Sequence, residues 1–380
     1  MMKQHNLRNS SLPSLCARDL QNSYRRIILT VLALLTLYTI PAEGQDATEQ
    51  ETKGSDRQYV SLFENDEQLD VSIYLDLSSF LRKTDRNSSF DALMTMYFSQ
   101  TDTVQSNVSI SYRGQSRYDL CRFPPMKVRF KKPVYEASDS GRIKKIKLVN
   151  QCQPGYNYEE YVIREYLVYK LYEVLTDTCY RTRLLKISFI DTEKKRKPLV
   201  QYGIFIEPDA VLAGRTNTVE AKSGSVRQSH MFPAMIDRIA VFNYMVSNWD
   251  WAVISRHNIK VFIPADYGQA MLGIPVPFDF DLAGVVNADY ALPLPETGIS
   301  SNRDRKFSGI CRPAETYKQT LMLFLDKKEE FYTVVNDFPY LGKSAKKDIT
   351  WFLDQFFDQM EKEKSLNRLI DNFLQTCREQ

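Results

Sequence analysis

The sequence predicts an α+β fold with a strand-rich amino-terminal half and a helix-rich carboxy-terminal half. Segments that alternate apolar and polar residues, which is typical of half-buried strands, gather before residue 208. After that point, apolar residues recur with a helical period. A chain of 380 residues with 43% hydrophobic residues can bury a substantial core, in one large domain or two modest ones.

The first 44 residues are predicted to be a signal peptide. Arg25 and Arg26 precede an apolar run over 27–40, which is short for a bilayer span, and small residues at 42–44 offer a cleavage site. A single-pass anchor is the alternative. The polar segment 45–57 is predicted to be a disordered linker. We therefore expect an exported protein, periplasmic or secreted, with no transmembrane helix after leader cleavage.

The charge balance argues against nucleic acid as a partner. The first 44 residues carry five of the 50 basic and two of the 47 acidic residues, so the remainder has 45 of each. A mature chain without net charge lacks the basic excess that phosphate backbones require. Only three histidines are present, which argues against a His-rich zinc site.

Five cysteines follow the leader, and they predict one or two disulfides with at least one free thiol. These are Cys121, Cys152, Cys179, Cys311 and Cys377. In an oxidising compartment we expect Cys121 to pair with Cys152, because both flank strand-like segments of the same sheet. No Cys-x-x-Cys motif occurs, which argues against redox catalysis and a zinc ribbon.

The elements of the first half are mostly strands, and they make up a predicted strand-rich part over 58–207. Strands are predicted at 71–75, 108–112, 124–130, 143–149, 181–190 and 200–207, with a helical turn near 77–81. The first strong helix covers 159–175. The basic turn 194–197 is most simply a solvated hairpin tip.

The second half, 208–380, is predicted to be the helix-rich part that carries an acidic site. Helices are predicted at 231–247, 316–336 and 343–377, with a short strand at 259–263. The basic loop 300–312 could recruit an acidic acceptor, although such loops are more often solvated surface segments.

The stretch from Asn248 to Gly284 holds the candidate site. Asp250 lies between two tryptophans, and Asp279 and Asp281 flank a phenylalanine after an apolar Pro-Val-Pro. Burying a carboxylate without a partner is costly, so this pattern favours a site for a divalent cation and a general base. The alternative is a pair of acidic turns in which Asp250 and Asp281 cap helices.

A second candidate site lies at the end of the strand at 108–112. Arg113 and Arg117 surround a glycine and a serine, and such a strand end can present backbone N–H groups and cations to a phosphate. The alternative is an ordinary hairpin turn, for which glycine is the default residue.

The order of these motifs resembles the protein-kinase-like superfamily, and most closely the spore-coat CotH kinase family with its exported bacterial relatives. The similarity covers about residues 108–290. It rests on Arg-Gly-x-Ser at 113–116, Pro-x-Lys-x-Arg-Phe at 125–130, Tyr-Gly-x-Phe-x-Glu at 202–207, Asn-x-Asp-Trp at 248–251, His257-Asn258, and Pro-Phe-Asp-Phe-Asp at 277–281. The resemblance implies a two-lobed protein-kinase-like fold and an atypical kinase that uses ATP with Mg²⁺ or Mn²⁺.

The resemblance also implies roles for individual residues. Lys127 would contact the ATP phosphates, with Glu165 as its ion-pair partner, although Glu207 or Glu159 could serve instead. Asp250 would be the catalytic base. The metal ligands would be Asn258 and Asp279, with Asp281 as a further carboxylate, and Arg113 and Arg117 would steady the phosphates.

Three classes of function follow from this sequence. The first is an exported kinase that phosphorylates a protein or another acceptor of the cell envelope. The second is a non-catalytic binding or structural protein of the envelope, which the absence of a Gly-rich phosphate loop favours. The third is a glycosidase with Asp250 and Asp279 as its carboxylate pair. Metal-dependent turnover would separate the first class from the others.

Overall fold

The computed structural model describes residues 59–114, 116–136, 141–221, 226–266 and 272–378. The predicted signal peptide and linker lie outside the described residues. The described chain belongs to one compact unit. In this part of the chain, no helix has the length and apolarity needed to cross a membrane.

The first half of the described chain forms one large mixed sheet. Its strands are β1 (Tyr59–Val60), β2 (Leu69–Leu75), β3 (Ser89–Tyr97), β4 (Thr103–Tyr112), β5 (Met126–Glu136), β6 (Arg142–Asn150), β7 (Thr182–Asp191) and β8 (Leu199–Ile206). They follow the order β1-β5-β4-β3-β2-β7-β8-β6, and β6 pairs back onto β5. Strands β2 to β8 therefore close into a seven-stranded barrel, to which β1 adds in parallel along β5.

The predicted two-lobed protein-kinase-like fold with a helical carboxy-terminal lobe is wrong. The sheet is a closed barrel because β5 pairs with both β4 and β6, and because β2 pairs in parallel with β7. The parallel pair brings together strands more than a hundred residues apart. Alternation of apolar residues identifies a strand and its buried face, but it carries no information on which strand lies beside it.

The barrel wall separates two apolar cores because successive residues of a strand point to opposite faces. Phe205 on β8 belongs to the core inside the barrel, and its neighbours Ile204 and Ile206 belong to the core outside. On β7, Leu185 belongs to the core inside the barrel and Leu184 to the core outside. These strands are therefore covered by apolar side chains on both faces.

Gly203 on β8 allows this wall to close. A Cβ atom there would lie 2.6 Å from Cδ1 of Ile187 and 2.8 Å from the carbonyl oxygen of Val149. Both contacts are shorter than real Cβ contacts, so only glycine fits between β7 and β6 at this point.

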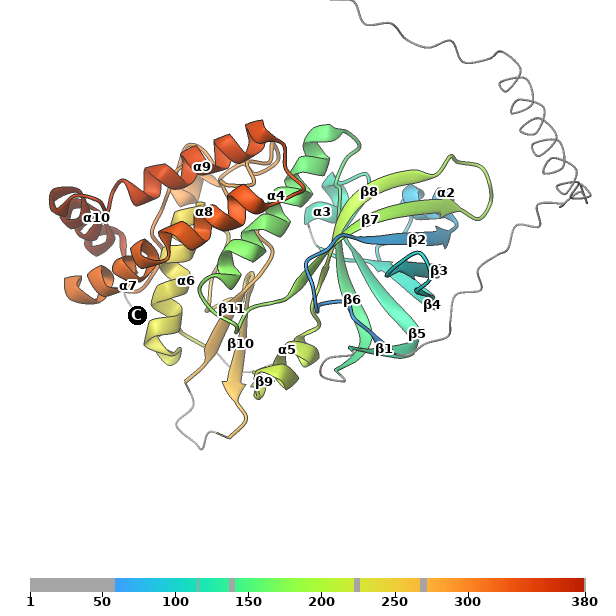
Figure 1. Ribbon diagram of the computed structural model, residues 1–380, viewed down its shortest axis with the longest axis horizontal. Helices are drawn as coiled ribbons and strands as arrows, with labels where there is room; N and C mark the ends of the chain where they lie inside the picture. Colours follow the sequence, from blue (N-terminus) through green and yellow to red (C-terminus); the bar gives the residue numbers. More distant parts are fainter. Residues whose placement is uncertain (1–58, 115, 137–140, 222–225, 267–271, 379–380) are drawn as a thin grey trace, which may run out of the picture. The chain divides into compact units, whose positions relative to one another are not determined.

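The short helices near residues 80 and 118 add Leu77, Phe80 and Tyr118 to the core inside the barrel, and most of the remaining elements bury apolar side chains in the core outside it. The helices are α2 (Leu77–Arg82), α3 (Ser116–Leu120), α4 (Tyr156–Glu173), α5 (Asp209–Arg215), α6 (Pro233–Val246), α7 (Ala314–Asp326), α8 (Lys328–Asp337), α9 (Lys343–Phe357) and α10 (Glu363–Thr376), with 3₁₀ turns at Gln228–His230 and Pro295–Thr297. A small sheet contains β9 (Thr218–Glu220), β10 (Ile259–Pro264) and β11 (Ile274–Pro277). Helix α4 contacts β7 and β8 on one side and α8 on the other, as Figure 1 shows.

Two predicted helices are each divided in the structure. The segment predicted as one helix over 316–336 breaks at Lys327, between α7 and α8, and the segment 343–377 breaks between α9 and α10. The apolar period continues across both breaks because both members of each pair bury a face in the same outer core. Strand β3 was not predicted at all.

Two disulfides close loops in the described chain. The predicted Cys121–Cys152 pair is confirmed, and its cysteines are 31 positions apart in the sequence. Cys311 pairs with Cys377 across 66 residues, which the sequence did not predict. Cys179 is a buried free thiol. Two disulfides are compatible with the predicted export.

Candidate functional site

The first part of the site is the loop that follows α6. The helix ends at Ser247, whose left-handed backbone (φ 54°) turns the chain and whose hydroxyl donates to the carbonyl oxygens of Asn302 and Asp304. The amide group of Asn248 donates to the side chain of Asn243, and its oxygen accepts from the backbone N–H of Asp250. These bonds fix where the carboxylate of Asp250 points.

Two side chains hold the carboxylate of Asp250. Oδ2 accepts a hydrogen bond of 2.8 Å from Nδ2 of Asn258, and Oδ1 lies 2.7 Å from Nε2 of His257. Asn258 adopts a left-handed backbone (φ 52°) and also donates to the backbone carbonyl of Asp250. The side chain of Asp250 remains 22% exposed, so an incoming hydroxyl group can reach it.

The second part of the site follows β11. Asp279 adopts a left-handed backbone (φ 63°), which costs free energy for a residue other than glycine and often marks a functional position. Its backbone N–H donates to the hydroxyl of Tyr169 on α4. Phe280 is fully buried against Tyr169 and Phe242, so the two flanking carboxylates are pinned by an aromatic anchor.

Two arginines approach these carboxylates from the barrel. Arg113 follows β4, and its Nη2 lies 3.9 Å from Oδ2 of Asp279. Arg117, on α3, has its Nη1 3.3 Å from Asp281 and 4.0 Å from Asp279. Arg117 also lies over the ring of Tyr290. The strand end and the acidic stretch, predicted separately from the sequence, therefore meet at one place.

Glu165 on α4 completes a buried group of three carboxylates. It is 1% exposed, and burial raises its pKa well above the ordinary value, with further increases from Asp281 and Asp279 that Arg117 and Arg113 oppose. The cluster holds more acid than base, so the protonated form of Glu165 is favoured.

The charges of Arg117 and Asp281 depend on each other. Burial alone would lower the pKa of Arg117, but the surrounding acids, Asp281 foremost, raise it. Burial raises the pKa of Asp281 to about 6, with Arg117 opposing the rise and Asp279 and Asp250 adding to it. Asp250 and the Asp279–Asp281 pair thus act on each other electrostatically.

Several buried polar atoms of this cluster have no hydrogen-bond partner among the described residues. They are Nη1 of Arg113, Nε of Arg117, Oε1 of Glu165 and Oδ1 of Asp279. Native proteins leave few such atoms, and a group of them in one place indicates bound water, an ion or a ligand. The cluster is therefore suited to bind water, an ion or a polar ligand.

A cavity of about 430 Å³ opens beside Arg113. Its lining also includes Lys127 on β5 and Lys147 on β6, which are directly opposed across the two strands, together with Asp209 and Glu220. Lys147 lies 4.4 Å from the ring centre of Phe278, and burial lowers its pKa although the nearby Asp209 raises it. With Lys145, which also lines it, four basic residues thus face one cavity next to the acidic cluster.

The predicted metal ligands fit a divalent cation in their chemistry. Carboxylate and amide oxygens are the ligands that Mg²⁺ prefers, and Oδ1 of Asp279 is buried and accepts no hydrogen bond from the described residues, although Nη1 of Arg117 lies 4.0 Å away. The carboxylate of Asp281 forms an ion pair with Arg117. Among the described residues, no group of three or more His, Cys, Asp or Glu side chains is placed to hold a metal ion.

The structure brings together most of the predicted site residues, but Lys127 does not contact Glu165. In the described chain Lys127 has no ion pair, and the charges that act on Glu165 belong to Asp281, Asp279, Arg117 and Arg113. Glu207, the alternative partner, is fully buried in an ion pair with Arg215. The environment of Glu165 is therefore the acidic cluster itself.

The sequence did not identify Lys147, Asp209 or Tyr290 as parts of the site. Lys147 was treated as one of several outward-facing lysines of its strand. It does point out of the barrel, but α5 and β9 cover that face, and Lys147 lies 3.9 Å from Asp209. In the sequence, only the alternation of Lys147 with Ile146 and Leu148 indicated on which face of the strand it lies.

The comparisons with known proteins add no identification. No protein-family model matches the sequence, and no curated protein is significantly similar to it.

Proposed function

We propose that this chain is an exported, metal-dependent phosphotransferase that moves a phosphoryl group from ATP to a hydroxyl of a protein or another envelope acceptor. The barrel fold gives no support to this activity. The proposal rests on one observation, which is that a cavity lined by Lys127, Lys147 and Arg113 adjoins the carboxylates Asp279 and Asp281 and shares Arg113 with them.

Each part of this arrangement has a task in phosphoryl transfer, which needs positioning and charge neutralisation more than covalent chemistry. Lys127, Lys147, Arg113 and Arg117 would bind the phosphate oxygens, and arginine offers paired donors for this purpose. A divalent cation held by Asp279, with Asp281 and Asn258 nearby, would neutralise charge on the phosphates.

Asp250 would act as the general base. Its carboxylate accepts the proton of the acceptor hydroxyl as the new oxygen–phosphorus bond forms and the bond to the β-phosphate oxygen breaks, releasing ADP. Asn258 and His257 hold this carboxylate in place, and a positioned base contributes about 10²–10⁴ in rate.

The first test is the thermal unfolding of the protein with MgATP, MnATP or ATP and a chelator. A ligand at 100 times its Kd stabilises by about 2.7 kcal/mol, and the shift in Tm should need the metal and should disappear in Asp279→Asn. Asp371→Asn, an exposed residue of α10, is the matched control. No shift with either metal for folded wild-type protein would refute the nucleotide site.

The second test separates the base from the ligands. Asp250→Asn should keep the MgATP-dependent shift in Tm but lose phosphate transfer to acceptor proteins by a factor of about 10²–10⁴. Equal transfer by wild type and Asp250→Asn would show that Asp250 is not the base.

The second candidate is a non-catalytic binding protein of the cell envelope. The ion pair between Arg117 and Asp281 favours it, because this pair already neutralises a carboxylate that a metal would need. This function predicts no metal-dependent shift and no transfer, but a specific partner in pull-downs from envelope extracts.

A further inference from the structure

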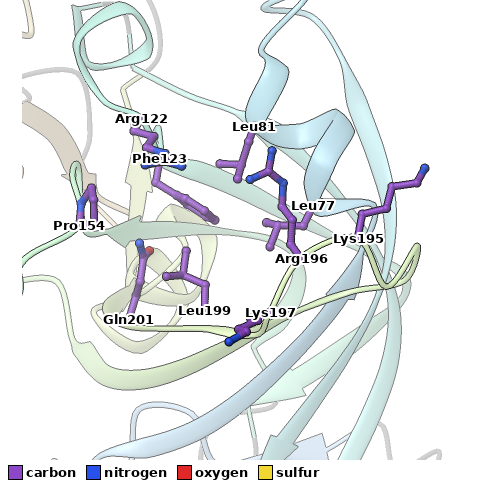
Figure 2. Close-up of a pocket in the computed structure, with 10 residues that line it drawn as sticks. All are labelled: Leu77, Leu81, Arg122, Phe123, Pro154, Lys195, Arg196, Lys197, Leu199 and Gln201. Carbon is purple, nitrogen blue, oxygen red and sulfur yellow. The ribbon is translucent and has the colours of Figure 1, made fainter.

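A second cavity lies at one end of the barrel, and its lining differs from that of the cavity beside Arg113. It has a volume of about 380 Å³ and is formed by α2, the turn between β7 and β8, β8 itself, and the chain that follows α3 (Figure 2). This volume is at the lower end of the range for small-molecule sites, about 300–1,000 Å³. It shares no lining residue with the cavity beside Arg113.

The floor of this recess is apolar. Leu77 on α2 and Phe123 are 1% and 3% exposed, and Leu199 and Leu81 are partly buried beside them. An apolar floor inside a concave site is suited to a hydrocarbon or aromatic group, which gains about 25 cal/mol for each Å² removed from water.

The rim of the recess is basic. Figure 2 shows Arg122 on one side and Arg196 and Lys197 on the other. Of these, Arg196 donates to the hydroxyl of Ser78, and none forms an ion pair among the described residues. No carboxylate is found among the described side chains that line the recess. The rim is therefore complementary to an anion.

Hydrogen bonds fix the backbone that carries the basic rim. The carboxylate of Asp191 accepts from the backbone N–H groups of Leu77, Lys195 and Arg196, which ties the β7–β8 turn to the start of α2. On the opposite side, the backbone N–H of Phe123 donates to the carbonyl of Cys152 in the Cys121–Cys152 disulfide. A ligand would find the recess already formed, which reduces the entropic cost of binding.

The most buried polar side chain that lines the recess has an oxygen without a hydrogen-bond partner among the described residues. Gln201 on β8 is 3% exposed, and its Oε1 is buried without a hydrogen bond in the described chain. Figure 2 shows its amide group among the lining side chains, near Phe123. A buried amide without a partner costs about 1–3 kcal/mol, so its retention here indicates a hydrogen-bonding ligand.

We propose that this recess binds a small anionic amphiphile with three features: a carboxylate or phosphate headgroup at the rim, an apolar chain or ring on the floor, and a hydroxyl group that donates to Gln201. A flat membrane surface would meet the cations but could not reach an amide that is 97% buried. The ligand is therefore a free molecule rather than a lipid in a bilayer.

The test uses three probes that differ by one group each. Calorimetric titration of the purified full chain compares 8-hydroxyoctanoate, octanoate, which lacks the hydroxyl, and 1,8-octanediol, which lacks the anion. We expect 8-hydroxyoctanoate to bind at least about tenfold more tightly than the diol, because a desolvated carboxylate gains charge-assisted bonds from the rim. Equal affinity of these two probes would overturn the proposal without any mutant.

Two variants locate the site. Arg122→Glu combined with Lys197→Glu reverses the rim and should weaken binding of 8-hydroxyoctanoate by about tenfold or more, whereas Lys318→Glu with Lys364→Glu makes the same charge change on exposed positions of α7 and α10 and should leave the affinity unchanged. Equal effects of the two pairs would assign binding to net charge and refute the site.

The proposed hydrogen bond from the ligand hydroxyl to Gln201 is tested by a cycle that combines one substitution in the protein with one change in the ligand. Wild type should bind 8-hydroxyoctanoate several times more tightly than octanoate, and Gln201→Leu should abolish this difference. A preference that persists in Gln201→Leu would remove the amide from the site. Rim-dependent binding to anionic vesicles without binding of the free probes would replace the proposal with a membrane surface.

Discussion

Asp281 offers the sharpest quantitative prediction, which concerns the free energy of unfolding of the Asp281→Asn variant. In the folded protein its pKa is about 6 instead of the ordinary 3.8, chiefly because the carboxylate is buried. At about 1.4 kcal/mol for each pKa unit, keeping Asp281 ionised costs the folded state about 3 kcal/mol at neutral pH. Asparagine has the same shape and no charge, so it avoids this cost.

The sign of the pH dependence follows from proton binding. Because the folded state holds this proton more tightly than the unfolded state, Asp281 lowers the free energy of unfolding as pH rises from about 4 to about 6, and the loss is complete above that range. Asp281→Asn should therefore match wild type near pH 4 and exceed it by up to about 3 kcal/mol at pH 7.5.

The assay is urea unfolding of both proteins at a series of pH values from 4 to 8. Asp371→Asn, an exposed position on α10, controls for the loss of one charge and should follow wild type at every pH. If the stability of Asp281→Asn stays parallel to wild type across this range, the buried-carboxylate argument is refuted. Glu165→Gln should act in the same direction, and the two substitutions should be less than additive because each relieves the other.

Three further predictions concern parts of the molecule away from the site. Replacing both Cys311 and Cys377 by serine should lower the free energy of unfolding by about 4 kcal/mol, since the disulfide closes a loop of 66 residues; a Tm unaffected by this change would contradict the loop-closure argument. Gly203→Ala should cost about 1–3 kcal/mol through its clash with the neighbouring strands, whereas Gly342→Ala, where a Cβ meets no atom within 4 Å, should change little in the same denaturation assay. Cys179, whose pKa burial raises to about 12, should resist iodoacetamide at pH 8 in the folded protein and react rapidly in urea, and rapid labelling of the folded protein would show that the thiol is accessible.

The sequence predicted local features well, because they depend on residues close together in the chain. The strand at 143–149, the helix at 159–175 and the turn at 194–197 all occur near their predicted places. The Cys121–Cys152 pair was also predictable, since both cysteines adjoin neighbouring segments of one sheet. What failed was the assembly of these elements, where the resemblance to kinases suggested two lobes and the strands instead close into a barrel.

The candidate site shows the same limit. The hydrogen bond between Asp250 and Asn258 joins residues eight positions apart, so the motif alone could suggest it. Lys147 was missed because the lysines that alternate with apolar residues along this strand were taken to face outward. Helix α5 and strand β9 cover that face of the barrel. The resulting burial lowers the pKa of the Lys147 amine.

Strand β8 contributes side chains to both apolar cores of this protein. Phe205 faces one core, while Ile204 and Ile206 face the other. A fragment that ended at Ile206 would keep every strand of the barrel together with α4, but it would leave the apolar face of α4 that contacts α8 exposed to solvent. The barrel is therefore not a module that recombination could transfer alone, and the two cores should be inherited, expressed and unfolded together.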